Sequence, residues 1–318
     1  MMNNFDKYFN NLDQYKKDYF NMLYPSIPIE VKEYIDVIIR LKDIDYFCGM
    51  KYASPYLYNF AYDFSRLDHS LACFLETLNF TNDFAMSLSA LFHDCNTPIF
   101  SHVVDYLYGD YVLQEVSESK NELFLLNNKL LAKLLDKDSI CIEQIICPKQ
   151  YSLVDNERPK LCVDRLDGIF LTSLAWSKCL DFKTMENLYK DLVVFNNEDK
   201  EKELGFNDKS NAEFLNYLEL KINKLCHGKE DNYSMFLMSS IIDHCIFNKY
   251  IDEMELYTLT EKEFIDTLKT KIIDDYELFV MWEAFTKTKE VDGVSKIKTK
   301  VRYLNPLYNA DGFIKRIK

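Results

Sequence analysis

The sequence predicts a mainly helical protein with a small β-like segment near its C-terminus. Its 318 residues include only 7 glycines and 7 prolines. These are too few for the many tight turns of a barrel, a sandwich or a doubly wound α/β fold. Apolar residues recur at helical spacing, and a hydrophobic content of 48% is enough for a large core. Glycine-rich phosphate-binding loops of the GxGxxG and GxxxxGK[ST] types are absent.

Apolar periodicity and capping residues indicate where the helices lie. Apolar residues spaced three or four apart predict a helix over 65–80. Thr81, Asn82 or Asp83 is suited to cap a second helix, which we expect to end at His93. Further helices are expected over 99–107, 121–135, 160–178, 211–226, 233–252 and 260–285.

Two later segments differ from this helical pattern. The stretch 196–210 is the most polar in the chain and is expected to be a surface loop between a helical core, 1–195, and a helical extension, 196–318, packed on it. Over 296–303 apolar residues alternate with Lys or Arg, the pattern of a strand with one cationic face. We interpret this strand either as an edge protected by lysines or as a phosphate-binding ribbon.

The net charge limits the partners that the protein can have. With 38 basic and 51 acidic residues, the charge of −13 argues against binding to nucleic acid. A small anionic substrate is still compatible with this net charge, provided that basic side chains are clustered at its binding site. No segment has the roughly 18 apolar residues of a membrane span, and no secretory signal is readable. Nine cysteines without a CxxC pair favour buried thiols and a cytoplasmic location. A homo-oligomer is left open.

Histidines and carboxylates on the predicted helices form a candidate metal site. His69, the pair His93-Asp94 and Asp164 provide nitrogen and oxygen ligands for one divalent ion such as Mn, Fe, Co, Ni, Zn or Mg. A second metal hypothesis uses the pairs 226–227 and 244–245, each a Cys beside a His. Neighbouring residues on a helix point about 100° apart, which weakens this second hypothesis.

The order of the first set resembles the HD-domain metal-dependent phosphohydrolases, whose ligands are His, then His-Asp, then a distant Asp. Here 24 residues separate His69 from His93, and 70 separate Asp94 from Asp164. The deoxynucleoside triphosphate triphosphohydrolase branch of that superfamily is the most similar. The similarity lies in the segments SRLDHSL (65–71), FHDCNTPIFSHVVD (92–105) and VDRLD (163–167).

The resemblance implies a helical HD-domain fold and a metal-dependent hydrolase of nucleotide phosphoesters or phosphoanhydrides, with a deoxynucleoside triphosphate as the first candidate substrate. A spacing of three places His102 and Asp105 on one helical face, where the carboxylate can orient the imidazole. Arginine offers a fork of donors to phosphate oxygens. The implied residues are His69, His93, Asp94 and Asp164 for the metal, His102 and Asp105 for proton transfer, and Arg66 and Arg165 for phosphate.

Two positions depart from that branch. Thr97 stands where the branch usually has a histidine shortly after its His-Asp pair, and Gln114 stands where it commonly has a histidine before a glutamate. Their side chains can hydrogen-bond a phosphate, and we expect them to bind substrate, but neither is a cationic acid near neutral pH. Two alternatives therefore stay open. One is a catalytically weak nucleotide-binding sensor or assembly module, and the other is a nucleoside monophosphatase.

Overall fold

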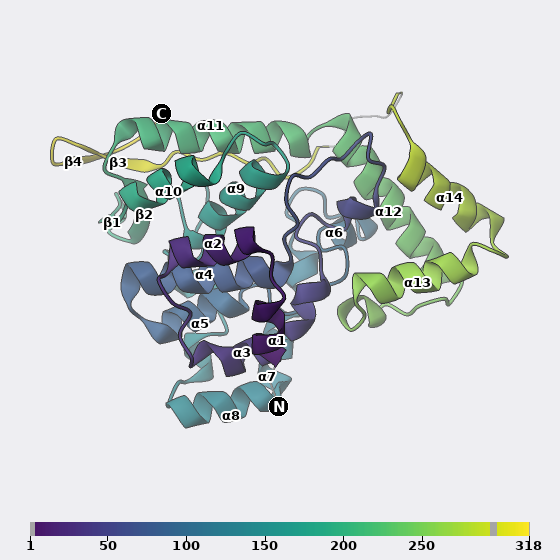
Figure 1. The fold of residues 1–318 in the computed structure, drawn as a ribbon, viewed down its shortest axis with the longest axis horizontal. Helices are drawn as coiled ribbons and strands as arrows, with labels where there is room; N and C mark the ends of the chain where they lie inside the picture. The colour runs from purple at the N-terminus through teal and green to yellow at the C-terminus, as the bar shows by residue number, and fades with distance from the viewer. Residues whose placement is uncertain (1–3, 293–297, 318) are drawn as a thin grey trace.

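The computed structural model describes residues 4–292 and 298–317 (Figure 1). This part of the chain forms fourteen α-helices and one four-stranded sheet, which confirms the mainly helical class with a small sheet. The helices are α1 (Asn4–Asn10), α2 (Gln14–Leu23), α3 (Val31–Val37), α4 (Arg66–Thr81), α5 (Phe84–Phe92), α6 (Val103–Leu107), α7 (Asn121–Asn127), α8 (Lys129–Asp138), α9 (Val163–Ala175), α10 (Phe182–Asp191), α11 (Lys209–Cys226), α12 (Lys229–Phe247), α13 (Glu261–Lys271) and α14 (Tyr276–Lys287).

Helix α4 lies at the centre of the fold and begins with a capping box. The Ser65 hydroxyl accepts a hydrogen bond from the Asp68 backbone N–H, and the Asp68 carboxylate accepts one from the Ser65 N–H. Such reciprocal caps satisfy backbone donors that have no partner within the helix. Asn82 ends α4 in the left-handed conformation, and Asp83 caps α5. The two helices predicted on either side of 81–83 are therefore confirmed.

Four of the predicted helices are shorter or divided, and one of them is α9, which is shorter than the predicted 160–178. Within 99–107 only α6 is helical, because Phe100 and Ser101 have left-handed backbone angles. The next predicted helix is divided into α7 and α8 at Asn128, whose side chain caps α8. The last is divided into α13 and α14, and Asp275 caps the second. The apolar periodicity of the sequence continues across the two divisions, so it predicted single helices. The capping side chains nevertheless start a new helix at each of them.

The sheet corrects the expectation of a surface loop over 196–210. Strands β1 (Leu192–Asn196) and β2 (Lys202–Phe206) form an antiparallel hairpin there. Strand β3 (Leu307–Ala310) pairs with β2 in parallel and with β4 (Phe313–Arg316) in antiparallel fashion. The apolar, β-branched run that begins at Leu192 favours the strand conformation of β1.

The strand expected over 296–303 is also corrected. Residues 296 and 297 lie outside the described residues, and 298–303 is not a strand. Its amides have other partners: the Lys300 N–H donates to the Tyr111 carbonyl, and the Arg302 N–H donates to the Asn223 side chain on α11. In Figure 1 this segment returns along α11 to reach the sheet.

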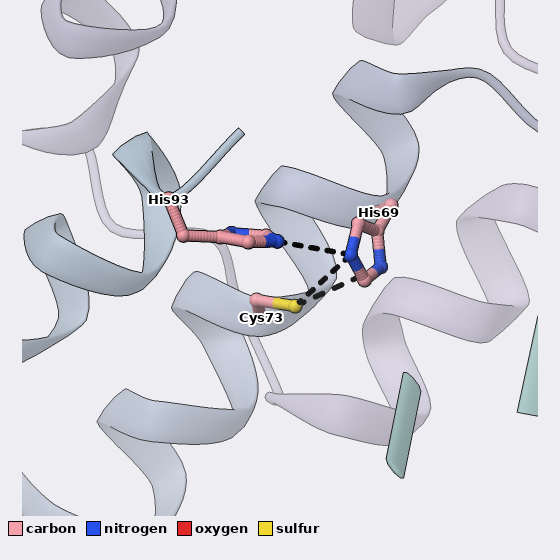
Figure 2. A group of neighbouring side chains, drawn as sticks. All are labelled: His69, Cys73 and His93. Atoms are coloured by element: carbon pink, nitrogen blue, oxygen red, sulfur yellow. Dashed lines mark hydrogen bonds between the residues drawn. The ribbon is translucent and has the colours of Figure 1, made fainter. Parts of the chain in front are cut away.

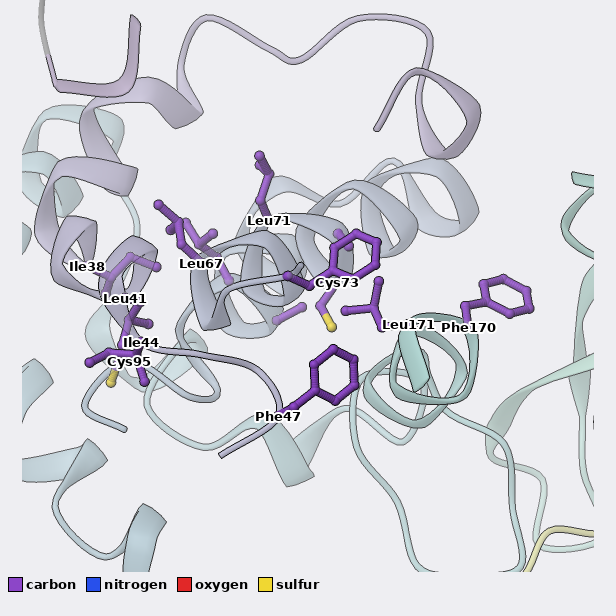
Figure 3. Packing of buried hydrophobic residues seen from close by; sticks show 14 of the residues in the cluster. Ile38, Leu41, Ile44, Phe47, Leu67, Leu71, Cys73, Cys95, Phe170 and Leu171 are labelled. Atoms are coloured by element: carbon purple, nitrogen blue, oxygen red, sulfur yellow. The ribbon is translucent and has the colours of Figure 1, made fainter. Parts of the chain in front are cut away.

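One continuous hydrophobic core joins these elements (Figure 3). Every residue of α4 from Arg66 to Leu78 is buried, including several polar ones. Figure 3 shows Leu67, Leu71 and Cys73 of this helix among side chains of the preceding segment and of α9. Burial of polar groups costs free energy unless they have partners. The buried polar side chains of α4 therefore indicate a functional site beside this helix. None of the described helices has the length and apolar character needed to cross a membrane.

Candidate active site

The four predicted metal ligands bring their donor atoms together. His69 Nε2 lies 3.1 Å from His93 Nε2 and 3.2 Å from Asp164 Oδ1. His93 Nε2 lies 3.5 Å from Asp164 Oδ1 and 3.7 Å from Asp94 Oδ2. Metal bonds of about 2.0–2.2 Å place neighbouring donor atoms about 3.0–3.5 Å apart. The donor set and its spacing therefore fit a divalent cation, held between α4, the end of α5 and the start of α9.

Hydrogen bonds behind the two imidazoles fix their orientation. His69 Nδ1 is 2.5 Å from Asp167 Oδ2, and His93 Nδ1 donates to the Ala90 carbonyl at 2.7 Å. These bonds place a ring proton on each Nδ1 and direct each Nε2, the nitrogen that would bind a metal ion, to the centre. The other oxygen of Asp167 accepts a hydrogen bond from the Tyr19 hydroxyl. Asp167 was not among the predicted site residues, although its position one helical turn after Asp164 was a signal.

Cys73 also lies beside this centre, and it too was not among the predicted site residues. It stands one turn after His69 on α4, and its Sγ is 3.7 and 3.9 Å from the two ring nitrogens of His69. Figure 2 shows the thiol directed toward His69, beside His93. Burial, with nearby carboxylates, raises the pKa of Cys73 well above its ordinary value. The side chain is therefore a neutral thiol in this structure.

Arg66 is a buried partner of the predicted ligand Asp94. Its Nη1 lies 2.8 Å from Asp94 Oδ2, its Nε donates to the Ser101 hydroxyl, and its guanidinium stacks over the Tyr46 ring. Burial raises the pKa of Asp94, but the charges of His93 and Arg66 outweigh burial and hold that pKa below its ordinary value. Arg66 thus keeps the Asp94 carboxylate ionised and fixed in place.

The structure also brings His102 and Asp105 together. His102 Nδ1 is 2.8 Å from Asp105 Oδ2. Asp105 accepts two further hydrogen bonds from Ser117, one from its N–H at 2.9 Å and one from its hydroxyl at 3.2 Å. Burial lowers the pKa of His102 below its ordinary value. The imidazole is therefore neutral at pH 7, with a fixed orientation and Nε2 available for proton transfer.

A cavity of about 830 Å³ adjoins these groups. All four metal-ligand residues line it, as do Arg66 and His102. Residues on both sides of position 195 line the cavity, so the predicted core and the predicted extension together form one site. Their division into domains stays a prediction. The basic residues on the wall are Arg66, Lys149, Arg158, Lys160, Arg165, Lys300 and Arg302.

Arg165 lines the cavity, but its guanidinium is directed to the neighbouring loop. It donates to the Asn156 side chain at 2.7 Å, to the Asn156 carbonyl at 2.8 Å and to the Lys160 carbonyl. Thr97 does not line the cavity, and its hydroxyl donates to the Asp94 carbonyl at 2.8 Å. These contacts hold the loop over 156–160 and the turn after Asp94.

Gln114 lies on the cavity wall beside a residue of the C-terminal segment. Its Oε1 accepts a hydrogen bond of 3.2 Å from Arg302 Nη2. Arg302 Nη1 donates to the Lys300 carbonyl at 3.3 Å, and the guanidinium forms no ion pair with any described residue. Thr299, Lys300 and Arg302 all line the cavity. The basic segment therefore faces the site, although it is an irregular strap and neither an edge strand nor a ribbon.

The second metal hypothesis finds no support in the described part of the chain. His227 Nδ1 contacts the Asn223 carbonyl, and His244 Nε2 contacts Asp275 Oδ2. These residues form no group of three ligands with Cys226 and Cys245. A group that does form, Asp155, Cys162 and Asp164, adjoins the first centre through Asp164.

Comparisons with known proteins give distant likenesses among solved structures alone. No protein-family model matches the sequence, and no curated protein matches it. Among solved structures, the fold is similar to a crystal structure of a phosphohydrolase from Bacteroides thetaiotaomicron. The two chains are 17% identical with a TM-score of 0.49, and the match covers 82% of this chain and 74% of the other. The function is therefore argued from the geometry of the site.

Proposed function

We propose that this protein is a metal-dependent phosphohydrolase that acts on a nucleotide phosphoester or phosphoanhydride, with a deoxynucleoside triphosphate as the first candidate. One observation carries the proposal: His93 Nε2 lies 3.1–3.7 Å from donor atoms of His69, Asp94 and Asp164, and all four residues line a cavity that cationic side chains also line. A divalent ion bound there would supply Lewis-acid chemistry, lowering the pKa of water and offsetting negative charge at phosphorus.

The cations on the wall give a phosphate its counter-charges. Arg66 is held by Asp94 and Ser101 beside the ligands. Arg302 is a half-buried cation without a carboxylate partner in the described part of the chain. Because a charge partly removed from water is costly when it is unpaired, an anion at this place stabilises Arg302 and is bound by it. Gln114 accepts a hydrogen bond from Arg302 and so holds it in place. The Thr97 hydroxyl and the Arg165 guanidinium donate instead to other groups of the protein.

His102 supplies proton transfer at the same wall. Its Nδ1 is bonded to Asp105, so Nε2 is the atom that accepts or donates a proton. An imidazole that is neutral at pH 7 accepts a proton from an attacking water and returns it to a leaving oxygen. Ser117 holds Asp105, and Asp105 in turn holds the ring.

Hydrolysis of a nucleotide panel tests the proposal. The substrates are nucleoside mono- and triphosphates and their deoxy counterparts, with Mn, Fe, Co, Ni, Zn and Mg added separately and products separated by chromatography. We expect metal-dependent turnover in the unaltered protein and its loss in Asp94→Ala and in His93→Gln. Asp243→Asn, an exposed carboxylate on α12, is the matched control. Near-UV circular dichroism verifies that each variant is folded.

The products separate the proposal from its alternatives. Release of triphosphate or pyrophosphate identifies the bond that is cleaved, while release of phosphate from monophosphates alone favours a nucleoside monophosphatase. Nucleotide binding by metal-loaded protein without turnover would overturn the enzyme and favour the sensor.

A further inference from the structure

A buried thiol lies beside the proposed metal centre and has no role in the reaction described above. Cys73 stands one helical turn after His69 on α4, and its exposed fraction is 1%. Residues four apart on a helix share one face, and two metal ligands on one helix can have this spacing. The ligand pattern that the sequence resembles, His, then His-Asp, then Asp, contains no cysteine. Cys73 is therefore a feature of this chain that the resemblance does not explain.

The sulfur of Cys73 belongs to a compact group of donor atoms (Figure 2). Sγ lies 3.7 Å from His69 Nδ1 and 3.9 Å from His69 Nε2. Sγ and one ring nitrogen from each of His69 and His93 all lie within 4.8 Å of one another. Tetrahedral bonds of about 2.3 Å to sulfur and about 2.0–2.1 Å to nitrogen separate the two donors by about 3.5 Å. A small rotation about the Cα–Cβ bond of Cys73 can close the remaining difference.

Cys73 reaches the centre from the side opposite the cavity. His69, His93, Asp94 and Asp164 line the cavity, whereas Cys73 does not. Figure 3 shows Cys73 among the apolar side chains of the core. Among the described residues, the thiol forms no disulfide and has no hydrogen-bond partner besides the His69 ring. A sulfur ligand on the core side would leave the cavity side of the centre open to water and phosphate.

We infer that Cys73 is a further ligand of the metal ion and that it selects zinc over magnesium and manganese. This inference rests on the metal site of the proposed function and names the class of metal that the site binds. Sulfur is a soft donor that favours zinc, whereas magnesium and manganese favour carboxylate, carbonyl and water oxygens. The metal binds the thiolate, so the thiol proton passes to the solvent when the sulfur–metal bond forms.

Cobalt(II) is a probe for a sulfur ligand that needs no enzymatic assay. A thiolate bound to Co²⁺ gives a sulfur-to-metal charge-transfer band in the near ultraviolet, which nitrogen and oxygen ligands do not give. We expect this band in protein whose exposed Cys141 and Cys147 have been changed to Ser. We expect its loss when Cys73→Ser is added to that background. Cys245→Ser, which alters another buried cysteine on α12, is the matched control.

Metal titrations test the predicted selectivity. Cys73→Ser replaces the soft sulfur by a hard oxygen and should weaken Zn²⁺ binding at least about tenfold, since even changes to the partners of metal ligands cost about 10- to 100-fold. The affinity for Mn²⁺ should be nearly unchanged. Cys73→Ala, which removes the donor but stays apolar, should also weaken Zn²⁺ binding selectively. A thiol that only packs in the core would change the two affinities alike, and near-UV circular dichroism verifies the fold of each variant.

The outcomes keep the two proposals apart. Metal-dependent nucleotide hydrolysis by a protein whose Co²⁺ form lacks the band would overturn the Cys73 ligand and leave the hydrolase standing. A band that Cys73→Ser removes, without hydrolysis of any nucleotide, would support the ligand and overturn the hydrolase. A band that persists in Cys73→Ser but disappears in Cys162→Ser would place the sulfur in the group with Asp155 and Asp164 and overturn the role of Cys73.

Discussion

The Nε2 atoms of His69 and His93 face each other at 3.1 Å, although His69 lies on α4 and His93 directly follows α5. Each ring is held from behind, by Asp167 and by the Ala90 carbonyl. Two lone pairs at this distance repel each other unless a proton or a cation lies between them. The backbone of α4 and α5 thus fixes two ligands in advance, which lowers the entropy cost of binding a metal ion.

His69→Ala should abolish tight metal binding, because it removes the donor that is close to both His93 and Asp164. Asp167→Asn keeps all four donors but alters the bond behind His69, and it should weaken metal affinity about 10- to 100-fold. Titration calorimetry with Mn²⁺ and elemental analysis measure both effects. His227→Ala, which changes a histidine at the end of α11, is the control. Unchanged affinity in a folded His69→Ala protein would disprove the assignment of the site.

His102→Gln should lower kcat about 10²- to 10⁴-fold, the usual contribution of a proton-transfer group. Burial lowers the pKa of His102 below 6.5. The neutral form is the active base, so kcat/KM should rise with pH, and the midpoint of this rise should lie below the ordinary pKa of a histidine. The Asp105 charge raises the pKa of His102, so Asp105→Asn should move this limb to lower pH still. If Asp105→Asn leaves the midpoint of this rise in kcat/KM unchanged, His102 is not the group that titrates.

Arg302→Ala should raise KM for nucleotides about tenfold or more, because a charge-assisted bond to phosphate is worth about 1.5–3 kcal/mol. Arg302→Lys should recover only part of the affinity that Arg302→Ala loses, since Lys lacks the planar fork of donors. Lys298→Ala, which alters an exposed residue of the same segment outside the cavity, is the control. Steady-state kinetics and nucleotide titrations report the effects. Equal KM values for Arg302→Ala and the control would remove Arg302 from the site.

Gly49→Ala should destabilise the fold more than Gly109→Ala. Both glycines have positive φ angles, 72° and 75°, which cost an alanine about 1–2 kcal/mol. A Cβ at Gly49 would lie 2.1 Å from Phe100 Cδ1, whereas one at Gly109 meets nothing within 4 Å. Overpacking adds about 1–3 kcal/mol at Gly49 alone. Urea unfolding measures the difference, and equal losses would mean that Phe100 moves aside without cost.

The grouping of the candidate metal ligands could be predicted because these residues stand in ordered, short segments. Asp167 stands one helical turn after Asp164, so α9 itself sets its position, although it was not among the predicted site residues. His102 and Asp105 meet for the same reason, at a spacing of three. Local geometry that repeats along a helix is the information that a single sequence holds most directly.

Contacts between distant loops could not be predicted in this way. Nothing in the periodicity of the sequence places Arg302 beside Gln114, or Asp231 beside Tyr58, since these pairs form only when packing brings remote segments together. The hairpin of β1 and β2 was missed because its polar turn dominated the composition of 196–210. Thr97 was expected to bind substrate because its hydroxyl can hydrogen-bond a phosphate, whereas the structure gives this hydroxyl a partner within the turn.

The return of the C-terminal strap along α11 imposes an order on biosynthesis. About 140 residues separate Asp164 from Arg302, which a ribosome adds in roughly 7–30 s at about 5–20 residues per second. During that interval the nascent chain already has all four residues proposed as metal ligands but lacks the arginine of the cavity wall. The proposed function therefore predicts that a cation can bind before the wall is complete, and that substrate binds only after the strap has docked.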